Sequence, residues 1–170
     1  VFPLVRREPV FWLLLASYAC FAFFYSSLLF SLLPILEERG FSAIAAVGVY
    51  TLIGPAQVAG RLGMFAADRL LPIGFAGMLG TGLPVVAMVV LIAVAPGSPM
   101  TILFPLLFGA GMGIKTIVQA TAAPDFLQIR EYGALQGILS TPVQLVQAVS
   151  PFVAALLWQL TGDYTALEGV

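Results

Sequence analysis

Five long apolar runs divide this sequence and limit the folds that it can adopt. Each run holds about 20 or more residues with few charges, and short polar or Pro/Gly-containing breaks separate the runs. At a rise of about 1.5 Å per residue, about 20 helical residues cross the hydrocarbon core of a bilayer. The runs cover residues 9–36, 43–67, 71–95, 100–123 and 133–160. We therefore predict an all-α membrane protein with five transmembrane helices.

Composition agrees with this prediction and excludes several classes of protein. Hydrophobic residues make up 61% of the 170 residues and charged residues 9%, whereas soluble domains are about half apolar and a quarter charged. Cys20 is the single cysteine, and histidine is absent. We therefore expect no disulfide, no metal site, no cofactor and no catalytic residue, which makes an enzyme the disfavoured class. A net charge of −1 gives no basis for a nucleic-acid partner.

The breaks between the runs predict how the chain is oriented in the membrane. The first run is too long for a signal peptide, lacks a small-residue cleavage site and is followed by further runs, so we treat it as a true span. With alternating spans, one side of the membrane receives Arg6, Arg7, Arg69 and Arg130. The opposite side receives a single basic residue, Arg39, together with Glu37 and Glu38. The positive-inside rule then places the N-terminus in the cytoplasm.

The ends of the sequence suggest a piece of a larger protein. The chain starts with valine and ends just after the polar segment 161-TGDYTALEG-169. Because five is an odd number of spans and the last segment leads onward, we expect residues 1–170 to be most of a six-helix bundle whose last helix follows.

The second run carries its polar residues on one helical face. Tyr50, Gln57, Arg61 and Asp68 stand at relative positions 0, 7, 11 and 18, which a period of 3.6 residues aligns. A guanidinium cannot lose its proton in a protein, and placing arginine at the centre of a membrane helix costs about 2.5–3.5 kcal/mol. This stripe must therefore face protein or water.

Other runs carry similar polar lines. The fourth run has Lys115 and Gln119 one turn apart, the first has Tyr18 and Tyr25 seven residues apart, and the third, 71–95, has almost none. In the fifth run the polar residues are Gln136, Ser140, Gln144 and Gln147. We therefore predict that the first, second, fourth and fifth helices surround a hydrated cavity and that the third packs outside them.

Small residues and prolines in the runs predict how the helices pack and bend. The segments 109-GAGMG-113 and 133-GALQG-137 each place two glycines four residues apart, which favours close helix approach. Prolines inside predicted spans can kink them, and these are Pro55, Pro84, Pro105, Pro142 and Pro151.

The break after the second run resembles a signature of the major facilitator superfamily. The segment 60-GRLGMFAADRLLP-72 is similar to the degenerate C-terminal copy of the family's G-x-x-x-D-R loop. Gly63 precedes Asp68 by five residues where the family has four, and Leu70–Pro72 replaces the usual G-R. The resemblance covers essentially the whole chain and implies the C-terminal six-helix half of a transporter with its last helix missing. Its partners would be the N-terminal half of the same transporter, the lipid bilayer and a small-molecule substrate.

Within that superfamily, Arg61 looks like an arginine of the monocarboxylate and oxalate/formate porters. In those porters the arginine is implicated in binding the substrate carboxylate, and an aspartate tends to stand where this chain has Gln57. That departure leaves proton coupling open. The segment 53-IGPAQVAGRL-62 looks closer to uncharacterised bacterial members, which implies the bacterial cytoplasmic (inner) membrane.

We therefore expect a secondary active transporter that moves a small organic anion by alternating access. The sequence does not decide whether the coupled ion is a proton or a counter-anion. It also does not decide whether transport is symport or antiport. The candidate substrate-binding residues are Arg61, Gln57, Lys115, Gln119, Gln144 and Tyr25. Asp68 and Arg69 are the candidates for a cytoplasmic conformational latch.

Each of these residues also has a structural explanation. Arg61 and Lys115 could extend to interfacial water, or Lys115 to Asp125. The glutamines could hold helices together, and Asp68 and Arg69 could be ordinary loop residues. The alternative function is therefore a non-transporting structural or assembly subunit of the membrane.

Overall fold

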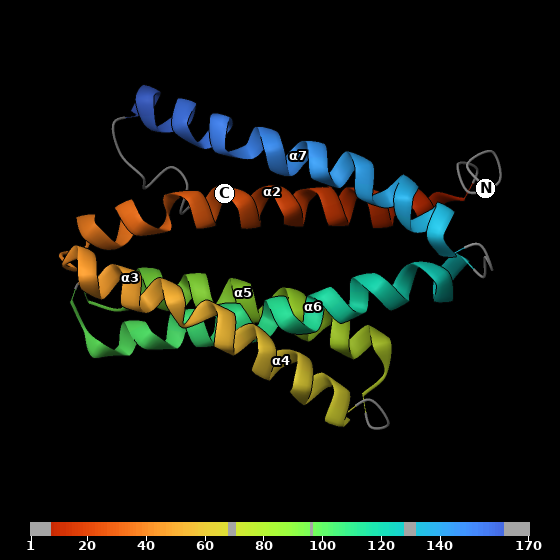
Figure 1. The fold of residues 1–170 in the computed structure, drawn as a ribbon, viewed down its shortest axis with the longest axis horizontal. Helices are drawn as coiled ribbons and strands as arrows, with labels where there is room; N and C mark the ends of the chain where they lie inside the picture. Colours follow the sequence, from red (N-terminus) through yellow and green to blue (C-terminus); the bar gives the residue numbers. More distant parts are fainter. Residues whose placement is uncertain (1–7, 68–70, 96, 128–131, 162–170) are drawn as a thin grey trace. The chain divides into compact units, whose positions relative to one another are not determined.

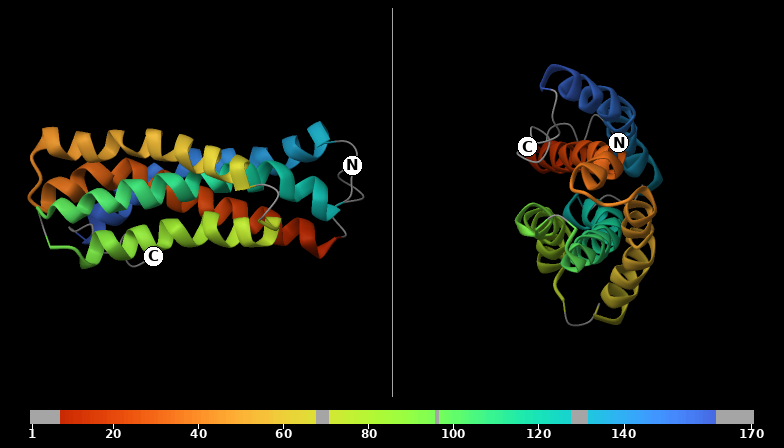
Figure 2. Two further views of the ribbon diagram at one scale, coloured as in Figure 1. Left: turned by 90° about the horizontal axis from the view of Figure 1, so that it is seen from below. Right: turned by 90° about the vertical axis from the view of Figure 1, so that its left-hand side faces the viewer.

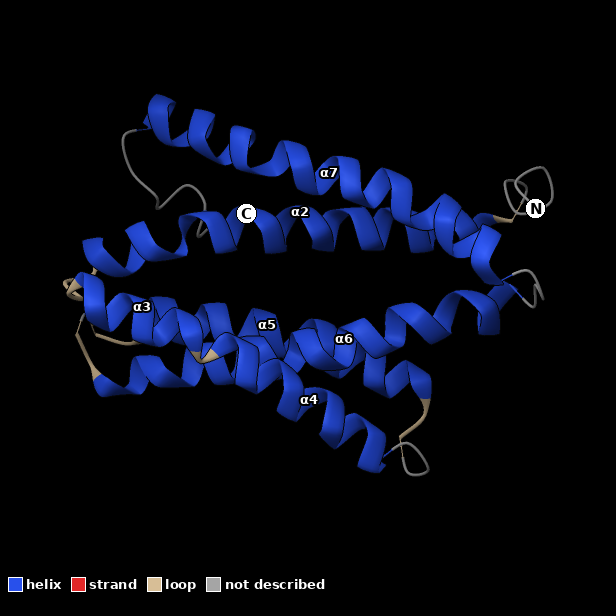
Figure 3. Cartoon of the chain, viewed as in Figure 1, coloured by secondary structure: helices blue, strands red, loops and turns tan. Residues whose placement is uncertain are grey.

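The computed structural model describes residues 8–67, 71–95, 97–127 and 132–161, and these residues form helices joined by short turns (Figures 1 and 3). The described residues contain no strand. In chain order the helices are α2 (Pro9–Glu38), α3 (Ala43–Thr51), α4 (Ile53–Ala67), α5 (Ile73–Ala93), the 3₁₀ turn η1 (Pro99–Ile102), α6 (Leu103–Leu127) and α7 (Tyr132–Thr161).

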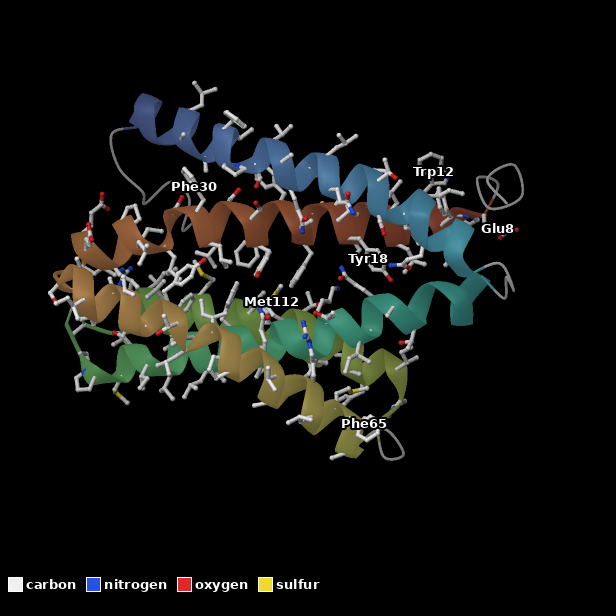
Figure 4. The ribbon with its side chains drawn as sticks, viewed as in Figure 1. Glu8, Trp12, Tyr18, Phe30, Phe65 and Met112 are labelled. Carbon is white, nitrogen blue, oxygen red and sulfur yellow. The ribbon has the colours of Figure 1, made fainter. Side chains whose placement is uncertain are left out.

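Five helical stretches are long and apolar enough to cross a membrane. They are Pro9–Glu38, Ala43–Ala67, Ile73–Ala93, Pro99–Thr121 and Gln136–Leu156. Large apolar side chains are exposed on these helices, and Phe65 is one that Figure 4 labels. Ile44 is 88% exposed and Phe65 is 82% exposed. A surface of this kind is suited to lipid and not to water. The prediction of an all-α membrane protein with five spans is therefore confirmed.

The chain divides into two compact units, which we describe separately. The first unit consists of Val1–Ser31 and Gln119–Val170, and the second of Leu32–Val118. Both boundaries fall inside helices, one in α2 and the other in α6.

In the first unit, α7 lies alongside α2 (Figures 1 and 2). Phe11 and Tyr18 of α2 are buried together with Leu139 of α7. Partly buried side chains close around this cluster, namely Leu14, Leu15, Ile138 and Val143. Side chains of this size keep the two backbones apart, so α2 and α7 pack through their side chains.

A proline in α7 creates a second link between these helices. Pro151 has no N–H, so the carbonyl of Gln147 four residues earlier loses its intrahelical partner. Ser26 Oγ of α2 donates to that carbonyl at 3.1 Å, and Ser150 Oγ donates to it at 3.3 Å. Hydroxyls of this kind commonly satisfy backbone groups that a proline frees in a membrane helix.

In the second unit, glycines bring α6 against α4 on one side and α5 on the other. A Cβ added at Gly113 would collide with the carbonyl oxygen of Gln57 in α4, and one at Gly60 with that of Ala110 in α6. A Cβ added at Gly111 would likewise collide with the ring of Pro84 in α5. The close approach predicted for 109-GAGMG-113 is thus confirmed, and the partner of Gly109 and Gly113 is α4.

The second glycine pair does not behave as predicted. A Cβ at Gly133 or Gly137 would meet no described atom within 4 Å. The prediction of tight packing at this pair was wrong, because α7 meets α2 through larger side chains such as Leu139.

Two of the prolines also act differently from the prediction. Pro55 is the third residue of α4 and Pro105 the third residue of α6. The first four N–H groups of a helix have no intrahelical acceptor, so a proline there removes no bond of its own helix. The second predicted span is instead interrupted at Leu52, where α3 ends and α4 begins. Pro84, Pro142 and Pro151 do lie inside helices, and so does Pro34 of α2.

The turn after α2 shows how one end of the second unit is fixed. Gly40 adopts a φ of 81°, its N–H donates to the carbonyl of Glu37, and the N–H of Phe41 donates to that of Leu36. This pair of bonds is the Schellman arrangement that ends many helices at glycine. Arg39 Nη1 also donates at 2.6 Å to the carbonyl of Leu91, in the last turn of α5, where a positive charge is favourable.

Candidate solute-binding site

A polar pocket of about 220 Å³ lies in the first unit. Tyr18, labelled in Figure 4, reaches it from α2. Gln119 reaches it from α6, and α7 supplies the rest of the lining. The α7 residues are Gln136, Leu139, Ser140, Val143, Gln144 and Gln147. Their spacing of three and four residues places them on one face of the helix. The polar stripe seen in the sequence of the fifth run therefore faces a cavity.

The lining offers hydrogen bonds without charge. Four amide side chains and two hydroxyls line the pocket, and none of its lining residues carries a formal charge at neutral pH. Tyr18 donates its hydroxyl to the carbonyl of Gln119 at 3.4 Å, and Ser140 Oγ donates to the carbonyl of Gln136 at 2.6 Å. The side-chain oxygen of Gln136 is buried and has no hydrogen-bond partner among the described residues.

The pocket contains two of the six predicted substrate-binding residues, Gln119 and Gln144. It also contains Gln136 and Gln147, which lie on the same polar stripe of the sequence as Gln144. Because the pocket extends over about three turns of α7, depth along the helix does not by itself identify the glutamines that line it.

The tyrosine that lines this pocket is Tyr18, and Tyr25 does not line it. Tyr18 lines it and is buried, whereas Tyr25 is half-buried and is not among the lining residues. The two share a helical face, but seven residues separate them by about 10 Å along the axis. The pocket includes Tyr18 and does not include Tyr25.

Arg61 and Gln57 lie on α4 in the second unit. The buried positions of α4 are Ile53, Ala56, Gly60 and Met64, and they form the face that packs on α6. Gln57 is half-buried at the edge of that face.

Arg61 follows Gly60, about 100° further around the helix. Its side chain is exposed and makes no hydrogen bond or ion pair with another described residue. Beyond it lies an apolar face that includes Leu62, which is 64% exposed. Arg61 thus lies between the face of α4 that packs on α6 and the exposed apolar face. No described residue provides a counter-charge for it.

Lys115 has a different environment. It is 6% exposed, and its Nζ donates to Thr81 Oγ1 of α5 at 3.1 Å. Gly80 makes room for it, since a Cβ there would lie 3.0 Å from the backbone nitrogen of Lys115. The protein encloses this ammonium, so the side chain of Lys115 does not extend to interfacial water. The run 71–95, in which the sequence offered almost no polar residue, supplies its hydroxyl partner.

The two latch candidates, Asp68 and Arg69, lie outside the described residues. No group of three or more His, Cys, Asp and Glu side chains that could hold a metal occurs in the described part of the chain.

Five membrane-length helices define an integral membrane protein. A family model of the Major Facilitator Superfamily matches residues 1–151. Since this match covers most of the 170 residues, the chain belongs to the Major Facilitator Superfamily, a family of membrane transporters. No curated protein and no solved structure gives a significant match. A small-molecule substrate and the lipid bilayer are therefore its partners.

Proposed function

We propose that this chain is the C-terminal half of a secondary active transporter that carries a small organic anion across the bacterial cytoplasmic membrane. The proposal rests on one observation about Arg61. Its guanidinium is exposed on a membrane-length helix and has no counter-charge among the described residues. A permanent charge at such a position needs water or an anion, because lipid cannot solvate it. Intramembrane cations of this kind commonly mark a substrate or ion path.

A carboxylate is the anion that best fits a guanidinium. The planar fork of arginine can donate two parallel hydrogen bonds to the two carboxylate oxygens, which adds orientation to attraction. Gln57, one turn before Arg61, adds a neutral donor and acceptor on the same helix. We propose Arg61 as the carboxylate clamp and Gln57 as an accessory ligand, with Lys115, Gln119, Gln144 and Tyr25 as further substrate contacts.

The mechanism we propose is alternating access. Two six-helix halves would rock around a site near the middle of the bilayer, and Asp68 with Arg69 would latch the cytoplasmic side in one state. The chain provides five membrane-length helices, which we assign to one of these halves. The N-terminal half of the same transporter would complete the site, and the coupled ion would be a proton or a counter-anion.

Transport by the full-length parent protein tests this proposal. The protein would be reconstituted into proteoliposomes and supplied with radiolabelled carboxylates, each beside a neutral amide or alcohol of equal carbon number. We expect saturable uptake of at least one carboxylate, competition by other carboxylates and weak competition by the amides. Imposed pH gradients and preloaded anions then separate proton symport from anion exchange.

The rival function is a structural or assembly subunit whose buried polar groups only hold helices together. It predicts no solute-dependent flux with any member of the panel, although the protein inserts and folds normally. Correctly folded protein with neither flux nor binding would therefore replace our proposal with this rival.

A further inference from the structure

We infer that the pocket of the first unit binds a small uncharged polyhydroxyl compound. The whole pocket lies within the first unit, so the inference rests neither on Arg61 nor on the proposed transport of an anion. It goes beyond the proposed function, because it gives the chain a second ligand of different chemistry. The lining comes from α2, α6 and α7, and none of its residues carries a formal charge at neutral pH.

Three amide side chains of the pocket are open to a ligand. Those of Gln119, Gln144 and Gln147 line the cavity and make no hydrogen bond with another described residue. Gln144 is exposed and the other two are half-buried, so all three keep accessible surface. Each amide offers both donors and an acceptor. The pocket therefore presents several unused hydrogen-bonding groups to whatever fills it.

The position of these amides in the membrane makes a polar occupant necessary. Gln144 and Gln147 lie near the middle of the membrane-length stretch Gln136–Leu156. An amide moved from water into an apolar environment without a hydrogen-bond partner costs about 2–7 kcal/mol. Acyl chains provide no such partner, so the cavity holds either water or a polar ligand.

The rest of the lining suits a ligand with a carbon skeleton better than water alone. Leu139 and Val143 form an apolar wall beside the amides. Buried water molecules make about three hydrogen bonds each, and this wall offers them none. Binding sites for small molecules commonly combine an apolar wall with a few polar groups. The volume of about 220 Å³ equals that of about seven water molecules at about 30 Å³ each, which suits a compound of three or four carbons.

The polar groups of the pocket favour hydroxyls over carboxylates. A hydroxyl both donates and accepts, as do the amides that face it. The hydroxyls of Tyr18 and Ser140 donate to backbone carbonyls, so their oxygens are available as acceptors. A carboxylate only accepts, and it would leave water without a counter-charge from the lining. An uncharged polyol meets neither obstacle.

Three four-carbon compounds test the inference on the purified full-length parent protein in detergent. Erythritol has a hydroxyl on every carbon, butane-1,4-diol has them only on its end carbons, and succinate has carboxylates at both ends. Titrations followed by saturation-transfer difference NMR give a Kd for each compound, with protein-free micelles as the blank. We expect erythritol to bind at least about fivefold more tightly than butane-1,4-diol, because the poorer ligand leaves amides of the pocket without partners.

Gln147→Leu is the matching variant, since Gln147 lines the pocket and is not among the residues proposed for the anion. It removes the amide at similar volume, while the backbone carbonyl that accepts from Ser26 and Ser150 stays in place. We expect it to weaken erythritol binding at least about fivefold. Tyr18→Phe removes a hydroxyl from the α2 side of the pocket and should weaken erythritol binding in the same direction. Leu145→Ala is the control, because Leu145 is 64% exposed and lies outside the pocket.

Weaker erythritol binding in Gln147→Leu and Tyr18→Phe, with wild-type binding in Leu145→Ala, supports the inference. The inference is overturned if erythritol does not bind to folded protein, because the pocket then holds only water. It is also overturned if both pocket variants bind erythritol like the wild type, or if butane-1,4-diol binds as tightly as erythritol. Succinate binding that Gln147→Leu weakens would show that the pocket accepts an anion, which contradicts the inference as well. Carboxylate uptake through Arg61 is measured separately, so failure of either proposal leaves the other to its own test.

Discussion

Arg61→Gln is expected to abolish carboxylate uptake without lowering the amount of folded protein in the membrane. The variant keeps a polar side chain of moderate length but loses the charge and the fork. Removing one partner of the desolvated charge pair that a bound carboxylate would form costs about 2–5 kcal/mol, which corresponds to a loss in affinity of about 30-fold to about 4,000-fold. Because the described residues give Arg61 no partner, the substitution breaks no described bond within the protein. Initial uptake rates over a range of carboxylate concentrations measure the effect.

Two further variants make this result interpretable. Arg61→Lys keeps the charge but loses the planar fork, so we expect it to retain partial uptake with a higher KM. Leu62→Ala alters the neighbouring exposed apolar position and should leave uptake near the wild-type level. If Arg61→Gln transports with normal saturation, Arg61 is a structural cation and the carboxylate clamp does not exist.

Gly113→Val should prevent the second unit from folding normally. Its Cβ would collide with the carbonyl oxygen of Gln57, and the backbone nitrogen of Arg61 would lie only 3.0 Å away. These are backbone atoms of α4, so relief requires the two helices to separate. Overpacking of a well-filled interface costs about 1–3 kcal/mol and more where the backbone must move, against a total stability of about 5–15 kcal/mol. We expect a several-fold loss of monodisperse protein and a lower unfolding temperature in detergent.

Gly63→Val is the matched control for this prediction. Gly63 lies on α4, and a Cβ at that position would meet no described atom within 4 Å. Both variants add a β-branched residue to a helix, so any difference between them reports on packing and not on helix propensity. Equal behaviour of the two variants would show that α4 and α6 do not depend on this close approach.

The five spans could be predicted from the sequence because the bilayer imposes one strong rule. Every backbone polar group in hydrocarbon must be satisfied within its own segment, so a long apolar run in lipid becomes a helix. The same rule gives no information on turns inside a span. The interruption at Leu52 therefore escaped prediction, although Gly54 and Pro55 stand beside it.

The sequence predicts which face of each helix is polar, but it does not predict which residues of other helices lie opposite that face. Helical periodicity placed Gln136, Ser140, Gln144 and Gln147 on one face, and that face lines the pocket. Periodicity cannot tell which residue of another helix lies opposite. Tyr18 and Tyr25 stand on one face of α2 at different depths, and periodicity does not show which of them lines the pocket; the substrate role of Tyr25 stays a prediction.

The environment of Lys115 shows the same limit. A single threonine in an apolar run carries almost no signal in the sequence, yet Thr81 Oγ1 accepts from the ammonium. What places them together is the close packing of α5 on α6 at Gly80 and Gly111. Contacts of this kind depend on tertiary structure, which single-helix patterns do not contain. The substrate role of Lys115 stays a prediction, and its enclosure adds weight to a structural role.

Water access to position 61 tests our central claim most directly, namely that the guanidinium stands in a hydrated part of the protein. Cys20 is exposed and would first be replaced by serine. Arg61→Cys and Leu62→Cys are then treated, in inside-out and right-side-out membrane vesicles, with a charged thiol reagent that does not enter lipid. We predict rapid modification at position 61 in at least one orientation, slowed by a transported carboxylate, and little modification at position 62. If Arg61→Cys is as unreactive as Leu62→Cys in both orientations, position 61 lies in lipid or in a dry interface, and a hydrated carboxylate site at Arg61 is contradicted.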